Sequence, residues 1–142
     1  MIRVKRLVIA EVEYIAFTLA REMLTFNEPI PEFSTRFPSI LESCLAVPFQ
    51  AFGRKHFYPT LIKKAAILFY LMIKNHPFQN GNKRIAVTTL LVFLNRNYKW
   101  ITVPPVALYK FSVMIAGSPA KDKDKVVSII EKFLRSFLVE SR

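Results

Sequence analysis

The chain of 142 residues is 52% hydrophobic, carries a formal charge of +11 and contains one cysteine. This composition excludes a disordered chain and a disulfide-bonded scaffold, so we expect one domain over residues 1–142. The longest apolar stretch, residues 65–73, is too short to cross a bilayer, and no signal peptide is recognisable, so the expected location is the cytoplasm.

The positive charge predicts attraction to an acidic partner, which could be a nucleotide, a nucleic acid, an anionic surface or an acidic protein. The lysines and arginines are scattered along the chain without a long basic block, so charge alone does not choose among these partners. Cys44 lies among apolar residues, which favours a small core residue in a reducing compartment.

Hydrophobic periodicity predicts an almost entirely helical fold. A spacing near 3.6 predicts an amphipathic first helix over residues 11–26, and two prolines predict a rigid extended connector after it. Residues 48–59 are aromatic and contain Gly53, which predicts a β-hairpin that closes as a lid. Further helices are expected over residues 39–46, 61–74, 80–97, 104–116 and 119–139. The predicted fold class is therefore all-α, a compact bundle of about six helices with one small hairpin.

Residues 76–84, His-Pro-Phe-Gln-Asn-Gly-Asn-Lys-Arg, join two strongly apolar helices. Pro77 disfavours helical geometry at His76, so the imidazole is expected to leave the preceding helix on a turn. Asn80 is a good cap residue and Gly81 accepts unusual backbone angles, so a new helix is expected to begin here. The free amide groups in the first turn of that helix predict an anion site.

An accessible imidazole beside an anion site suggests phosphoryl or nucleotidyl transfer. His76 is the candidate general base, because a neutral imidazole can take a proton from a hydroxyl nucleophile. Phe78 is expected to point inwards and anchor the loop. Lys83 and Arg84 are adjacent on a helix and cannot both face one ligand squarely, which leaves one of them to serve structure. Phosphate contacts are assigned to the start of the helix: Gly81, Asn82, Lys83 and Arg84.

These nine residues resemble the Fic/Doc signature, which reads histidine, any residue, phenylalanine, any residue, an acid, glycine or alanine, asparagine, glycine or lysine, and arginine. The resemblance extends over residues 30–100, and it implies a small helical fold that transfers AMP or phosphate from ATP to a protein hydroxyl. It also implies that the signature histidine, His76, is the general base. The family's flap, which aligns the target segment, falls on the hairpin residues Phe52, Gly53, Arg54, Lys55 and His56.

The chain departs from the family pattern in three ways. Asn80 stands where the family has an acid that holds Mg²⁺, and a neutral amide is a poorer ligand, so the cation would arrive with the ATP phosphates and water. Lys83 and Val87 replace a glycine and a second arginine of the AMP-transferring members. This favours the death-on-curing branch, which phosphorylates and acts as the toxin of a toxin–antitoxin pair. The nearest stretch to the family's inhibitory helix, residues 18–23, ends in the wrong residue, which fits a separate antitoxin.

The same residues also have simpler interpretations. His76 would then be a structural histidine, Asn80 and Gly81 a cap and a turn, and the two cations after them a solvated helix start. Two other functions therefore stay open. One is a catalytically weak or inactive family member that binds an acidic partner. The other is a nucleic-acid-binding protein, which rests on charge alone because no base-reading helix is recognisable.

Overall fold

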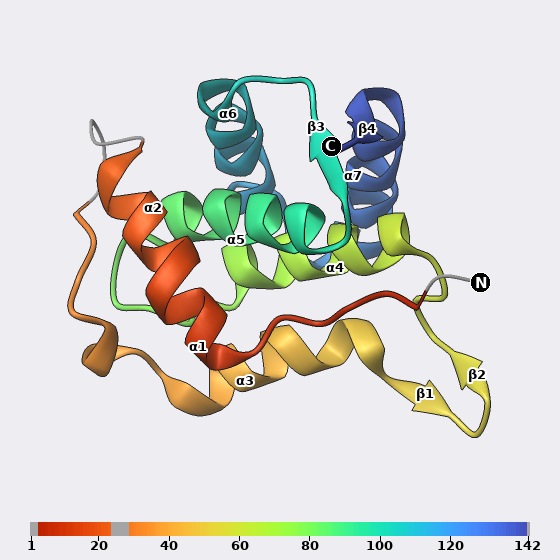
Figure 1. Cartoon of the computed structure of the whole chain (residues 1–142), viewed down its shortest axis with the longest axis horizontal. Helices are drawn as coiled ribbons and strands as arrows, with labels where there is room; N and C mark the ends of the chain where they lie inside the picture. The colour runs from red at the N-terminus through yellow and green to blue at the C-terminus, as the bar shows by residue number, and fades with distance from the viewer. Residues whose placement is uncertain (1–2, 24–28, 142) are drawn as a thin grey trace.

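The centre of the computed structural model, which describes residues 3–23 and 29–141, is a pair of packed helices (Figure 1). The first, α4 (Leu61–Lys74), begins where the Thr60 hydroxyl accepts a hydrogen bond from the backbone N–H of Lys63 at 3.1 Å. Residues 64–73 of α4 are all buried, as its nearly continuous apolar sequence predicts. The second helix, α5 (Asn82–Arg96), runs back along α4, so the loop between them lies at one end of the core.

The remaining helices cover this central pair. The first helical segment, residues 9–22, crosses α5, the next helix runs beneath α4, and the last two pack on the side of the central pair opposite to that helix (Figure 1). Their bounds are α1 (Ile9–Glu11), a π-helical turn (Val12–Ala16), α2 (Phe17–Glu22), α3 (Pro38–Ala46), α6 (Pro105–Ala116) and α7 (Lys123–Phe137). Short 3₁₀ turns occur at Phe33–Thr35, Val47–Phe49 and Ala120–Asp122.

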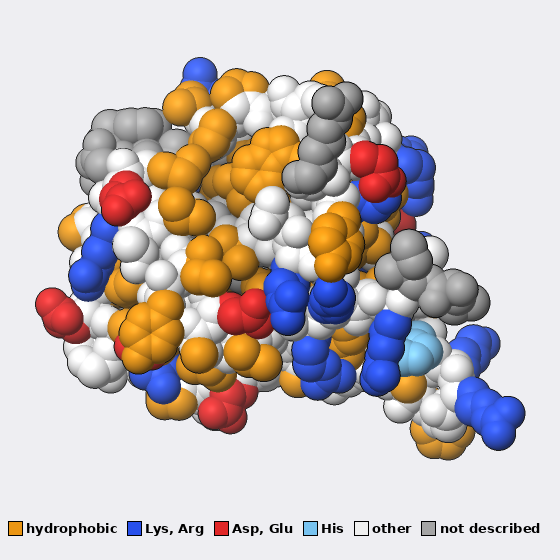
Figure 2. Space-filling view, viewed as in Figure 1, with side chains coloured by type: hydrophobic (Ala, Val, Ile, Leu, Met, Phe, Trp, Pro, Cys, Tyr) orange, Lys and Arg blue, Asp and Glu red, His pale blue; other side chains and the backbone are white. Residues whose placement is uncertain are grey.

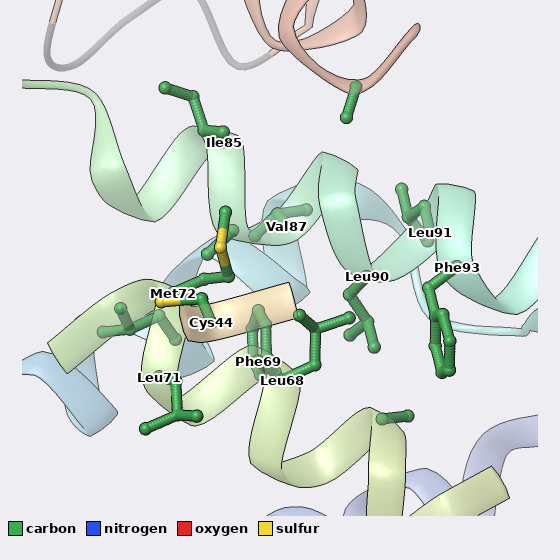
Figure 3. Packing of buried hydrophobic residues seen from close by; sticks show 14 of the residues in the cluster. Cys44, Leu68, Phe69, Leu71, Met72, Ile85, Val87, Leu90, Leu91 and Phe93 are labelled. Carbon is green, nitrogen blue, oxygen red and sulfur yellow. The ribbon is translucent and has the colours of Figure 1, made fainter. Parts of the chain in front are cut away.

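The core lies between α4, α5 and α3. Figure 3 shows side chains of α4 and α5, among them Leu68, Met72 and Leu90, filling the space between the two helices. Cys44 of α3 is fully buried in this cluster, as expected of a small core residue. Burial raises the pKa of its thiol to about 12, so Cys44 is not a nucleophile at neutral pH.

Two short antiparallel strand pairs complete the described chain. The expected hairpin is formed by β1 (Ala51–Phe52) and β2 (Lys55–His56), and Gly53 takes a φ of +62° in its turn. The second pair, β3 (Lys99–Ile101) and β4 (Leu138–Glu140), was not expected. The apolar residues at positions 138 and 139 continue the helical pattern of α7, whereas their pairing with β3 is a non-local contact that periodicity does not reveal.

The all-α expectation is confirmed, with several differences in detail. The first helix begins two residues before the predicted start, contains a π-helical turn and ends at Glu22, with Met23 already extended. The predicted continuation to residue 26 is therefore wrong at Met23, and residues 24–26 lie outside the described residues. The N-cap of α5 is Gly81 and not Asn80, because the chain reaches helical angles only after the left-handed glycine. No described helix combines the length and the apolar character that crossing a lipid bilayer requires.

Candidate functional site

The loop between α4 and α5 presents His76 to solvent. Asn75 ends α4, and His76 then adopts a φ of +51°, a left-handed conformation that is uncommon for a residue other than glycine. The ring of Pro77 excludes right-handed helical angles at His76, which explains why the chain turns here. Pro77 and Phe78 are less exposed than the flanking loop, with Phe78 fully buried, while His76, Gln79 and Asn80 lie at the surface. Strained residues of this kind cluster at functional sites.

Asn82 holds the loop in this shape. Its side chain is buried, and its Oδ1 atom accepts a hydrogen bond from the Phe78 N–H at 3.0 Å while its Nδ2 atom donates to the Phe78 carbonyl at 2.9 Å. The same Nδ2 atom lies 3.5 Å from Nδ1 of His76. The predicted contribution of Asn82 was a backbone contact to phosphate, whereas the structure adds a side chain that organises the loop from within.

The side-chain amide of Asn82 also contacts the ring of His76. The hydrogen bonds with the Phe78 N–H and carbonyl distinguish the oxygen of the Asn82 amide from its nitrogen. The atom that faces Nδ1 of His76 is therefore the nitrogen, Nδ2. The roles of the two atoms in this contact depend on the tautomer of the His76 ring. At 3.5 Å the contact is long for a hydrogen bond, so it constrains the orientation of the ring only weakly.

Phe78 anchors the loop from below. Its side chain is 1% exposed and contacts the rings of Phe17 and Phe33, with centroids 5.5 and 6.0 Å away. Phe17 and Phe33 themselves meet edge to face at 5.2 Å. The loop is therefore fixed against the first helical segment and the connector to α3, not only against its own two helices.

The connector between the first helical segment and α3 passes over the glycine of the loop. A Cβ atom at Gly81 would lie 2.7 Å from Cδ1 of Ile30 and 2.9 Å from the carbonyl oxygen of Pro29. Farther along, the Phe37 N–H donates to the Pro77 carbonyl at 2.9 Å. Sequence reasoning identified a rigid proline connector but not its position, because only the tertiary fold brings it across the loop.

Arg84 corrects one of the sequence-based assignments. Its guanidinium is 4% exposed, and Nη2 donates to the backbone carbonyls of Ala20 at 2.5 Å and Met23 at 3.1 Å. One turn farther along α5, the Thr88 hydroxyl donates to the Ala16 carbonyl at 2.7 Å. Arg84 and Thr88 thus satisfy carbonyls of the first helical segment. The Arg84 side chain serves structure, and the half-buried Lys83 is the basic side chain of this helix start that remains a candidate for phosphate.

The residues of the loop do not fit a protein-held Mg²⁺. Oδ1 of Asn80 accepts a hydrogen bond from the Gly81 N–H at 2.8 Å, and the loop contains no carboxylate. Within residues 3–23 and 29–141, no group of three or more His, Cys, Asp or Glu side chains is placed to hold a metal ion. A hard dication prefers carboxylate oxygens, so we derive no step through a resident metal.

The hairpin lies at the wrong end of α4 for the role predicted from the resemblance. Residues 52–56 precede α4, whereas His76 follows it, and Figure 1 shows the hairpin and the loop between α4 and α5 at opposite ends of α4. A helix of 14 residues separates them by about 21 Å. Phe52, Gly53, Arg54, Lys55 and His56 are all exposed, but a target segment aligned by them would not reach His76 in this structure. The segment near the loop is the connector that includes Pro29 and Phe37.

A family model described as the Fic/DOC family matches residues 8–94 of the chain. The chain belongs to the Fic/DOC family. The match starts well before residue 30, where the sequence resemblance was expected to begin, and it includes the first helical segment that Phe78 and Arg84 contact. It does not separate the death-on-curing branch from the others. The curated proteins and the solved structures gave no match to this chain.

The structure places two positions of the family pattern in this Fic/DOC protein, one in the core and one at the surface. Val87 occupies the position at which the resemblance implies a second arginine in AMP-transferring members. Its side chain is fully buried in the core and cannot face a ligand. His76, the signature histidine, is exposed at the junction of the two central helices. The arrangement therefore offers an accessible imidazole, a nearby lysine and the amides of a helix start.

Proposed function

We propose that this Fic/DOC protein is a transferase that moves the γ-phosphoryl group of ATP to a hydroxyl of a target protein. AMP transfer is the alternative outcome of the same site. The observation that carries the proposal is the exposed, left-handed His76 beside the start of α5, on a loop held by Asn82 and Phe78. Family membership supports transferase chemistry, and the buried Val87 favours phosphate over AMP.

The proposed reaction needs few protein groups. The target hydroxyl oxygen attacks the γ-phosphorus, its proton passes to the imidazole of His76, and the bond from phosphorus to the bridging oxygen breaks with its electrons leaving on ADP. Lys83 and the first amides of α5 supply positive potential for the phosphates. The 3.5 Å contact between Nδ2 of Asn82 and Nδ1 of His76 helps to orient the ring that accepts this proton.

Labelled ATP tests the proposal and identifies the group transferred. The protein is incubated with cell lysate, Mg²⁺ and ATP that carries the label on either the α- or the γ-phosphate. We expect a labelled protein band from γ-labelled ATP alone. Label from the α-position would assign AMP transfer, and the absence of label from both would remove the proposal of transferase activity.

We further propose that the protein acts in the cytoplasm as the toxin of a toxin–antitoxin pair. The support is the resemblance to the death-on-curing branch at Lys83 and Val87, together with the missing inhibitory sequence. A separate antitoxin would then block the exposed loop. Growth arrest on expression is the corresponding observable, and it is combined with the His76 substitution below.

A second candidate function is a catalytically weak family member that acts by binding. Asn80 in place of an acid favours it, because the loop then offers no carboxylate to Mg²⁺. The substitution Asn80→Asp tests it, because a carboxylate at the exposed start of α5 interacts favourably with the helix dipole and adds a strong Mg²⁺ ligand. If the natural protein is weak for lack of this ligand, Asn80→Asp should raise the transfer rate by about tenfold or more in Mg²⁺.

The control for this substitution is Gln79→Glu, which adds the same charge one exposed position earlier in the loop. The transfer rate of Gln79→Glu should stay within about twofold of the rate of the natural protein, because this variant changes the charge of the loop without placing a carboxylate at position 80. Equal rates for Asn80→Asp and the natural protein would show that the missing carboxylate does not limit the reaction.

A further inference from the structure

A second candidate binding site lies at the opposite end of α4 from His76. A cavity of about 830 Å³ opens there between the extended N-terminal residues, the hairpin and the end of α5. Figure 2 shows the basic side chains of this face gathered beside the hairpin. Of the nine residues that line the cavity, none is acidic and six are basic: Arg3, Lys5, Arg6, His56, Lys64 and Arg96.

The buried lysine of this cavity is held in place by the fold. Lys64 is 4% exposed, and its ammonium donates to the carbonyls of Pro48 at 3.1 Å and Tyr58 at 2.5 Å, on either side of the hairpin. The same ammonium lies 4.9 Å from the centre of the Phe49 ring. These two hydrogen bonds use two of the three ammonium protons, and the cavity that Lys64 lines contains no carboxylate.

Three of the other basic residues are also held by contacts with the rest of the fold. Lys5 exchanges backbone hydrogen bonds with the side chain of Asn97, at 2.7 and 2.9 Å, which fixes the N-terminal segment against the end of α5. The guanidinium of Arg6 lies over the ring of Phe49, 4.7 Å from its centre. Arg96 has a carboxylate partner, Glu11, at 3.1 Å, outside the cavity lining.

Bringing these positive charges together is unfavourable in free energy, and a bound anion would oppose this effect. Burial, and then the nearby charge of Arg6, lower the pKa of Lys64, which means that the protein surroundings of this lysine disfavour the charged ammonium. An anion in the cavity would oppose both effects. The cluster is therefore better suited to a bound ligand than to stabilising the isolated chain.

We propose that this cavity binds a small, multiply charged phosphoanion, either an inorganic oligophosphate or the oligophosphate of a nucleotide. The volume falls within the range of small-ligand sites, about 300–1,000 Å³. Lys64 lies at the buried base of the cavity, where a compact group can reach it and the backbone of an extended nucleic acid cannot. The site is separate from the candidate active site and does not depend on the proposed function.

The two histidines of the chain make the test direct, because one belongs to each site. Proton NMR follows the imidazole signals of His56 and His76, assigned with His56→Gln and His76→Gln, while inorganic triphosphate or ATP is added at constant ionic strength. We expect a saturable shift of the His56 signal with triphosphate. Tighter binding of ATP than of triphosphate would identify a nucleotide as the ligand, and equal binding would identify the oligophosphate alone.

Charge-removing variants separate specific binding from general attraction. Arg3→Gln with Arg6→Gln removes two exposed cations of the cavity and should weaken triphosphate binding by about tenfold or more. The control removes two lysines that do not line the cavity, Lys110→Gln with Lys132→Gln, and should change binding by less than about twofold. The proposal is overturned if the His56 signal does not shift, if the control weakens binding as much, or if only a single-stranded oligonucleotide binds.

Discussion

The substitution His76→Asn is expected to reduce phosphate transfer by about 10²–10⁴-fold, the usual contribution of a general base. Asparagine is chosen because it tolerates the left-handed backbone that His76 adopts, with a φ of +51°. The side chain is exposed, so its loss should leave the unfolding temperature almost unchanged. The measurement is the initial rate of incorporation from γ-labelled ATP, with the thermal unfolding curve recorded for the same sample.

The matched control is His56→Asn, which removes the other histidine of the chain from the exposed hairpin. Because the hairpin lies at the far end of α4, the transfer rate should not change. Expression in bacteria should arrest growth for the natural protein and for His56→Asn but not for His76→Asn. A His76→Asn protein that labels its target at the natural rate would refute the assignment of the general base.

Among substitutions that add one methyl group to the loop before α5, Gly81→Ala is expected to lower the free energy of unfolding the most. The left-handed φ of +72° costs an alanine about 1–2 kcal/mol. The added Cβ would also lie 2.7 Å from Ile30 Cδ1 and 2.9 Å from the Pro29 carbonyl, and such overpacking costs about 1–3 kcal/mol more. Since the backbone carbonyl cannot rotate away, the connector must shift and the loop with it. The free energy of unfolding from urea denaturation measures the sum.

Gly53→Ala separates the two costs. Gly53 in the hairpin turn has a similar φ of +62°, but a Cβ there would meet nothing within 4 Å. Its substitution should therefore cost only the conformational part, about 1–2 kcal/mol. Transfer should fall for Gly81→Ala and stay unchanged for Gly53→Ala, since only the first displaces the His76 loop. Equal losses of stability would mean that the contact with the connector is unimportant.

Arg84 shows how a motif can contain two kinds of residue that look alike in sequence. Lys83 and Arg84 are neighbouring cations at a helix start, both are candidates for phosphate from the sequence, and one of the two is expected to serve structure. In the fold, successive positions on a helix point about 100° apart, so the two side chains leave α5 in different directions and Arg84 faces the first helical segment. The guanidinium then caps carbonyls of Ala20 and Met23, which joins the signature to the N-terminal part of the family match.

The sequence by itself determined the parts that depend on neighbouring residues. These are the apolar helix at residues 61–74, its end before the histidine and proline, the left-handed glycine at the next helix start, and the hairpin turn at Gly53. Each follows from local sterics, capping or hydrophobic periodicity, which act over a few residues. The family signature is also local, because its nine residues are consecutive. The sequence alone therefore identifies His76 as the candidate general base.

Only the tertiary structure decided what depends on contacts between distant segments. It turned Arg84 inwards, brought Pro29 and Ile30 over Gly81, paired β3 with β4, and placed the hairpin away from His76 beside a basic cavity. These outcomes depend on how whole helices pack to bury their apolar faces, and the same local sequence is compatible with several such arrangements.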